Sequence, residues 1–299
     1  MVWPNGISLR IYLWIYMMTT NSSTGRLIAQ AILLALAAAM LQQVVHESTH
    51  GLMALAVGMR WEMLNLFASS ASWPGEPNLG GEAVVAGSAA VVDIAVALGG
   101  FALLRTQALI RRPRWRLLLF YYVAISWLAG FGYLLVDSLF YNPASENVGD
   151  WRKVIAFLGG AWSVRLPILL VGLVGTLLSY FWMPAMALRF GEGRLERAQR
   201  IRIALPLLLI PYFCTSLVLT CLSYWHPMGA TGVVLVMMKT WMGYSPFIWS
   251  FFIACYWMPF PDGIRQLSTL PAGTSWPWLY WPAGFVLGVV GLLVPTLHF

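Results

Sequence analysis

The residues His46-Glu47-Ser48-Thr49-His50 place two histidines four positions apart, with a glutamate directly after the first. On a helix, residues i and i+4 lie on one face, so both imidazoles can bind a single metal ion. A glutamate in this position can act as general base towards a water molecule at that ion. Zinc would lower the pKa of such a water and polarise a scissile carbonyl. The spacing therefore predicts a metal-assisted hydrolytic site with His46 and His50 as ligands and Glu47 as the base.

A structural reading competes with this chemistry, because a five-residue pattern of this kind also arises by chance. In that reading the three ionisable side chains form a polar helix-packing cluster that is hydrogen-bonded to its neighbours. The motif interrupts the apolar run 27–59. Each charged residue at the centre of a membrane-spanning helix costs about 2.5–3.5 kcal/mol on insertion scales. Three such groups on two helical turns favour a compensating ligand.

The composition assigns the chain of 299 residues to the membrane proteins. Apolar residues make up 60% of the chain and charged residues only 10%, whereas soluble domains have about 45–50% and roughly 25%. The three cysteines and the many aromatic residues exclude a disulfide scaffold and a disordered chain. The net charge of +7 comes from arginines clustered between apolar runs, so it indicates membrane topology and no nucleic-acid partner.

Hydropathy predicts an all-α polytopic membrane protein with about seven transmembrane helices. A bilayer-spanning helix needs about 20 mostly apolar residues. The expected spans are 27–59, 84–104, 117–141, 166–188, 203–225, 232–257 and 279–297.

Loop charge predicts the orientation of these spans. Arginines cluster at 105–116 and at 189–202, and the number of intervening spans puts both loops on one face. The positive-inside rule makes that face cytoplasmic. Two segments then lie outside, 60–83 and 142–164. The first of them is expected to form a hairpin or a loop lying against the bilayer. We expect a multi-pass integral protein of a bacterial-type cytoplasmic membrane, with the lipid bilayer as its surroundings.

Two segments of the chain resemble a known family. Residues 44–51 close an apolar helix with the histidine motif, and the small residues 86–90 open the second span. Together they are similar to the site-2 proteases, which are membrane-embedded zinc metalloproteases. Where the family has A-G-P-x-x-N at the second span, this chain has Ser88 for the proline and Val91 for the asparagine. The resemblance covers about residues 27–155. Within the family, the chain resembles a divergent, short member.

The resemblance implies Zn2+ as cofactor and hydrolysis of peptide bonds in or near transmembrane segments of a membrane-protein substrate. Hydropathy and the resemblance together divide the chain into three regions: an N-terminal cytoplasmic or interfacial segment 1–26, a site-2-protease-like core 27–164 and an additional transmembrane helical bundle 165–299. In the family the zinc lies nearer the cytosolic face, whereas the arginines put His46 nearer the outside. Either segment 11–18 contributes to the crossing, or this branch is inverted.

Three aspartates are candidates for the third metal ligand, since a catalytic zinc takes three protein ligands. Asp150 follows the third span in the sequence Gly-Asp-Trp, which resembles the motif of divergent short members. Asp137, near the outer end of the third span, is the alternative on the same side. Asp262, in Pro-Asp-Gly, looks most like the better-known Leu-Asp-Gly motif but follows the sixth span, on the opposite face. We expect His46, His50 and Asp150 to be the ligands.

Other functions fit parts of the sequence. A non-catalytic membrane subunit, retaining the protease core as a scaffold of a larger complex, would explain segment 165–299 as a binding surface for partner subunits. A transporter would use Asp93, Asp137 and Lys239 as a charge relay, but no inverted repeat supports it. We interpret Asp93 as a hydrogen-bonded helix contact, and Lys239 as a structural residue that pairs with an aspartate or extends to the interface.

Overall fold

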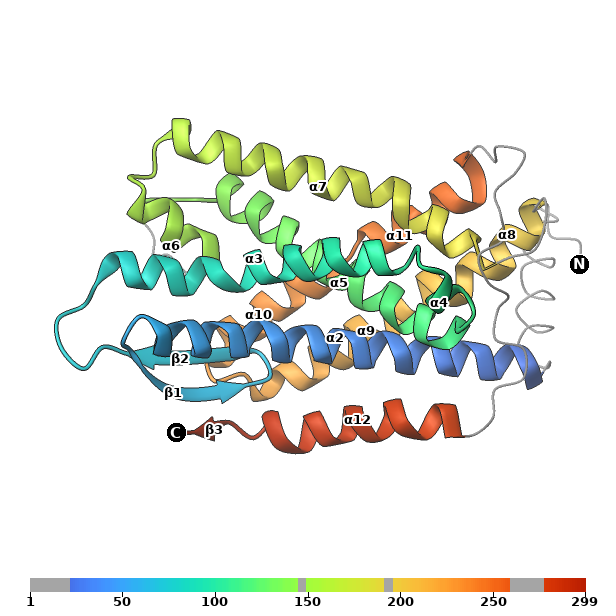
Figure 1. Ribbon diagram of the computed structural model, residues 1–299, viewed down its shortest axis with the longest axis horizontal. Helices are drawn as coiled ribbons and strands as arrows, with labels where there is room; N and C mark the ends of the chain where they lie inside the picture. Colours follow the sequence, from blue (N-terminus) through green and yellow to red (C-terminus); the bar gives the residue numbers. More distant parts are fainter. Residues whose placement is uncertain (1–21, 145–148, 191–195, 259–276) are drawn as a thin grey trace, which may run out of the picture.

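The computed structural model shows a mostly helical protein (Figure 1). Asp262 and the interfacial segment predicted at 11–18 lie outside the described residues. The structure describes residues 22–144, 149–190, 196–258 and 277–299.

Five helices are long and apolar enough to cross a membrane, so the chain has the architecture of a multi-pass membrane protein. Four are continuous, and the fifth contains a π-helical turn beside Pro206, where the missing N–H interrupts the regular hydrogen bonds. The continuous helices are α2 (Ser22–Ala56), α3 (Leu79–Leu103), α5 (Pro113–Leu139) and α7 (Trp162–Leu188). The composite helix Arg197–Trp225 consists of α8 (Arg197–Ala204), η1 (Leu205–Leu209), α9 (Ile210–Leu222) and η2 (Ser223–Trp225).

The sixth and seventh predicted spans are helical but are not long continuous helices. The sixth is broken near Lys239, Gly243 and Pro246. The seventh, α12, has an apolar stretch that is shorter than the five long helices. The elements are α10 (Gly229–Met237), η3 (Met238–Gly243), α11 (Pro246–Phe252), η4 (Ile253–Trp257) and α12 (Pro277–Leu293).

Helix α2 lies at the centre of the bundle, where it contacts α3, α5, α9 and α12. Helix α7 packs on the far side of α5 and forms an edge of the molecule (Figure 1). In the most apolar 18-residue window of α5, 67% of the residues are buried, against 22% in that of α7. The apolar side chains that α7 leaves exposed fit a lipid-facing helix. Helices α2 and α5 therefore provide the interior in which polar groups can be held.

The expectation of an all-α fold is wrong in one respect, because residues 60–72 form a β-hairpin. Strands β1 (Arg60–Asn65) and β2 (Ala68–Ser72) pair antiparallel, and β3 (Leu297–His298) pairs with the other edge of β1. Gly58, with φ of 92°, reverses the chain after α2, a conformation that glycine adopts without strain. The alternative of a hairpin in segment 60–83 is thus confirmed.

The hairpin joins the end of α2 to the C-terminal segment of the chain. The Asn65 side chain donates a hydrogen bond to the carbonyl of Val294 at 2.9 Å, and the Leu66 N–H donates to the carbonyl of Leu293 at 2.9 Å. Helices α9 and α12 both contact α2. The predicted core 27–164 and the C-terminal segment are therefore packed together.

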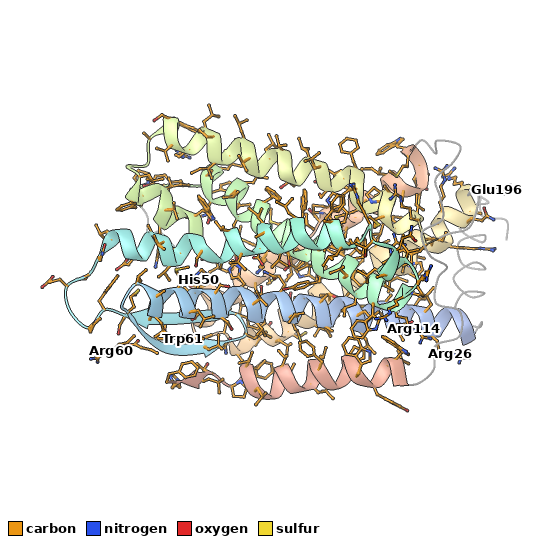
Figure 2. The ribbon with its side chains drawn as sticks, in the orientation of Figure 1. Arg26, His50, Arg60, Trp61, Arg114 and Glu196 are labelled. Carbon is orange, nitrogen blue, oxygen red and sulfur yellow. The ribbon has the colours of Figure 1, made fainter. Side chains whose placement is uncertain are left out.

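The polar elements gather at opposite ends of the bundle. The hairpin and α6 (Asp150–Phe157) lie at one end, and α4 (Gln107–Ile110) and α8 lie at the other (Figure 1). His50 lies towards the hairpin end, whereas Arg26 and Arg114 lie at the opposite end (Figure 2). The two arginine clusters thus flank helices that end on the same side, as the loop charges indicated.

Candidate metal centre

The histidine motif lies on α2, one turn and a half before this helix ends at Ala56, and its two imidazoles face the same point. The ring centroids of His46 and His50 are 5.0 Å apart, in an edge-on arrangement. Gly51 follows the motif directly, and the Trp61 ring of the hairpin occupies the place where a side chain at this position would lie. The hairpin therefore closes over α2 immediately beside His50.

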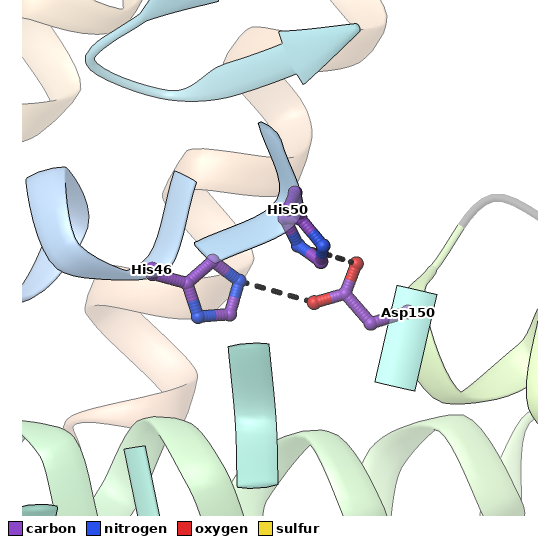
Figure 3. A group of neighbouring side chains, drawn as sticks. All are labelled: His46, His50 and Asp150. Atoms are coloured by element: carbon purple, nitrogen blue, oxygen red, sulfur yellow. Dashed lines mark hydrogen bonds and ion pairs between the residues drawn. The ribbon is translucent and has the colours of Figure 1, made fainter. Parts of the chain in front are cut away.

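Asp150 reaches both histidines from the first residue of α6 (Figure 3). Its Oδ2 lies 3.0 Å from Nε2 of His46, and its Oδ1 lies 3.4 Å from Nε2 of His50. Burial alone would raise the pKa of the Asp150 carboxyl. The charge of His50 and the hydrogen bonds from both histidines outweigh it and hold that pKa below its ordinary value. The carboxylate is thus kept ionised, which is the form that binds a metal.

The outer nitrogens of both imidazoles are held by acceptors of α3. Nδ1 of His46 lies 2.8 Å from Oδ2 of Asp93, and Nδ1 of His50 lies 2.9 Å from the carbonyl oxygen of Val85. Because a carboxylate and a carbonyl only accept hydrogen bonds, both Nδ1 atoms carry a proton. Nε2 of each ring faces Asp150. A metal ion bound at this point would displace any proton on Nε2 and take its lone pair. Histidines that bind metals are oriented in this way.

Ligand geometry at this point fits a small divalent cation. The candidate ligand atoms of His46, His50 and Asp150 all lie within 4.8 Å of one another. Tetrahedral zinc, with bonds of about 2.0–2.2 Å, separates its ligand atoms by about 3.3 Å. The direct contacts of 3.0 and 3.4 Å are close to that separation. The group can therefore hold a metal ion.

Asp137, the alternative ligand, has a different place in the structure. Its Oδ2 accepts a hydrogen bond from the Trp151 N–H at 2.9 Å, and its Oδ1 lies 3.4 Å from Nε of Arg152. It thus holds the first turn of α6 and does not join the two histidines. Asp137 is a positioning residue for Asp150.

Two glycines allow α6 to take this position. Gly149 has φ of 141°, and a Cβ there would lie 2.8 Å from Oδ1 of Asp137. Gly87 of α3 faces α6, where a Cβ would lie 2.9 Å from Cγ2 of Val154. A side chain at either site would push α6, and with it Asp150, away from α2.

Glu47 is buried beside the two ligands of α2, with 7% of its surface exposed. Its charged neighbours are His46, His50, Asp150 and Lys239. Within the part of the chain that the structure describes, its carboxylate forms no ion pair. It is therefore available to a water molecule at the site.

Asp93 forms the hydrogen-bonded helix contact that the sequence predicts. Its contact with the candidate ligand His46 was not predicted. Both oxygens of its carboxylate accept hydrogen bonds from Nε2 of Gln42, at 3.0 and 3.1 Å, while Oδ2 also faces His46. Gln42 and His46 are four residues apart on α2, so they present one polar stripe. This spacing, together with a single aspartate in the next span, is the sequence pattern from which the pairing of Asp93 with Gln42 and His46 could have been predicted.

Comparisons with protein-family models, with curated proteins and with solved structures find no match to this chain.

Proposed function

We propose that the chain is an intramembrane zinc metalloprotease that hydrolyses peptide bonds in or near transmembrane segments of membrane-protein substrates. The observation that carries the proposal is the convergence of His46, His50 and Asp150, within 4.8 Å, beside the buried Glu47. Two histidines and a carboxylate form a ligand set of catalytic zinc sites with an open fourth position. The same set also binds iron in oxygenases. The glutamate that follows the first histidine favours hydrolysis, because it supplies the base that the reaction needs.

Each residue has a task in this reaction. Bound at this site, Zn2+ would act as a Lewis acid towards a water molecule and the scissile carbonyl. Glu47 takes the proton of the attacking water and passes it to the amine nitrogen that leaves. Asp93 and the Val85 carbonyl keep the imidazoles in the tautomer that presents Nε2. Asp137 keeps Asp150 in reach through the first turn of α6.

The setting supports an intramembrane reaction. Peptide bonds of a transmembrane helix are internally hydrogen-bonded and shielded from water, so the enzyme must admit water to them. The side chains of His50 and Asp150 are 12% and 21% exposed, whereas that of His46 is 1% exposed. Water and substrate would thus approach from the α6 side, with the His46 side closed by Asp93.

The same proposal includes the membrane arrangement. We infer seven spans in a bacterial-type cytoplasmic membrane, with the broken segment α10–η4 and the short α12 as the sixth and seventh. The arginine-bearing ends at α4 and α8 support a cytoplasmic location for that side. The candidate site, at the hairpin end, then opens towards the outside.

Cleavage by the Glu47→Gln variant tests the proposal against the scaffold alternative. The purified chain is reconstituted in liposomes with a panel of transmembrane peptides. Glu47→Gln is expected to keep the metal and lose at least about 100-fold in cleavage rate, the low end for acid–base catalysis. Glu76→Gln, which removes an exposed carboxylate, is the matched control. Equal cleavage by Glu47→Gln would remove Glu47 from the mechanism. A metal-loaded wild-type chain that cleaves no peptide of the panel would favour the scaffold.

A further inference from the structure

Lys239, from the C-terminal half of the chain, lies beside the candidate metal centre. It belongs to the π-helical element η3, and its ammonium donates a hydrogen bond to Oε1 of Gln43 on α2. Its Nζ lies 5.4 Å from the centroid of the Tyr133 ring, and this ring stacks on His46 at 5.3 Å and 19°. π-Helical turns inside helices are frequent at functional sites.

The direct partners of Lys239 are uncharged. Among the described residues, no carboxylate forms an ion pair with its ammonium, which contacts only an amide oxygen and an aromatic ring. The acidic groups that act on it are Asp93, Glu47 and Asp150. A lysine inside a transmembrane bundle is costly unless its charge is compensated. Its compensation must therefore come from the carboxylates of the metal centre.

The charges of this centre sum to zero once a divalent ion is present. With their carboxylates ionised, Asp93, Glu47 and Asp150 contribute three negative charges, and the ion and Lys239 together contribute three positive charges. The imidazoles are neutral when they bind through Nε2, and Asp137 is paired separately with Arg152. We infer that Lys239 is a counter-charge built into the metal centre, supplied by the C-terminal half to balance the third carboxylate.

This role predicts that Lys239 weakens metal binding, because it repels a divalent cation nearby. For charges on the order of 10 Å apart at an effective dielectric constant of about 20, this repulsion changes affinity by about tenfold or more. A residue that only supported the packing of η3 would have the opposite effect, since its loss would loosen the site. The sign of the change in affinity thus separates the two roles. The inference rests on the proposed function only in requiring that the site binds Zn2+.

The test uses the full-length chain in detergent micelles, titrated with Zn2+ against a competing chelator. Lys239→Met removes the charge and keeps an unbranched side chain. Lys239→Gln removes the charge and keeps a hydrogen-bond donor for Gln43, so it decides the matter if the methionine variant does not fold. Lys239→Arg keeps the charge. The chain has only one other lysine, the exposed Lys153, and Lys153→Met is the matched control.

The neutral variants at position 239 are expected to bind Zn2+ about tenfold more tightly than the wild type or better. Lys239→Arg and Lys153→Met should bind it with wild-type affinity. If a folded neutral variant bound Zn2+ with unchanged or weaker affinity, Lys239 would not be a counter-charge of the metal centre. A wild-type chain that binds no Zn2+ would instead overturn the proposed function, so the two failures are distinguishable.

Discussion

Oδ2 of Asp93 lies 2.8 Å from Nδ1 of His46, so a carboxylate of α3 orients the first histidine of the motif on α2. The same carboxylate is held by Nε2 of Gln42, one turn before that histidine. All three side chains are essentially excluded from solvent. A buried carboxylate with this many partners on the neighbouring helix fixes the imidazole before any ion arrives. The pair is the clearest sign that the polar groups of α2 and α3 serve a common site.

Substitution of Asp93 tests this orientation. Asp93→Asn keeps an acceptor for Nδ1 of His46 but loses the charge that makes Nε2 a stronger ligand. We expect about 10- to 100-fold weaker zinc binding, the range for partners of metal-bound histidines. Zinc titration of the purified chain measures it, with Glu76→Gln as an exposed control. Wild-type affinity in Asp93→Asn would show that His46 needs no such partner.

The two aspartates at the end of the third span should respond differently to the same substitution. Asp150→Asn removes a charged ligand, and we expect at least about 100-fold weaker zinc binding. Asp137→Asn keeps an oxygen that can accept the hydrogen bond from the Trp151 N–H, so the metal should be retained. Zinc content after dialysis distinguishes the variants. Metal lost from Asp137→Asn and kept by Asp150→Asn would reverse the assignment.

Gly149 should tolerate no side chain. Its φ of 141° and the closeness of Asp137 mean that Gly149→Ala must shift the start of α6. We expect zinc affinity to fall by at least about tenfold, as Asp150 moves out of reach. Gly75→Ala, at a glycine with open space around it, is the control. Equal affinities for the two variants would mean that α6 adapts without moving its carboxylate.

Membrane orientation can be tested with single cysteines in a chain whose Cys214, Cys221 and Cys255 are replaced. Glu76→Cys, in the exposed loop before α3, should react with an impermeant reagent added outside intact cells. Arg111→Cys, at the end of α4, should react only after the membrane is opened. The opposite pattern would place the candidate site on the cytoplasmic side.

Much of the helical architecture follows from hydropathy, because a run of about 20 apolar residues has few alternatives to a helix in a membrane. The five long helices overlap the first five predicted spans. Residues 60–72 could be read as a hairpin or as a loop, because the pattern is short and the pairing with residues 297–298 depends on partners distant in the chain. The break at η3 can be located in the sequence from Lys239 and Gly243. The direction in which the Lys239 side chain points cannot be predicted in this way.

Within the site, the sequence predicted the residues that carry a local pattern and missed those that depend on packing. His46, Glu47 and His50 follow from helical spacing. Asp150 follows from its place after the third span and from the resemblance of its Gly-Asp-Trp sequence to a family motif. The pairing of Asp93 with His46 joins two helices, so its register cannot be read from either one. From the sequence, either Asp137 or Asp150 could be the third ligand. After the turn at Gly149, Asp150 contacts His46, whereas Asp137 accepts a hydrogen bond from the Trp151 N–H.

Elemental analysis of the purified chain shows whether His46 and His50 bind zinc. We expect about one zinc per wild-type chain, lost from His46→Ala and from His50→Ala, because a site with one remaining histidine lacks a ligand. If the chain contained iron in place of zinc, the metal site would be confirmed, but the chemistry of an oxygenase would be favoured over hydrolysis. Wild-type and His46→Ala chains that are equally free of metal would rule out a zinc site at these residues.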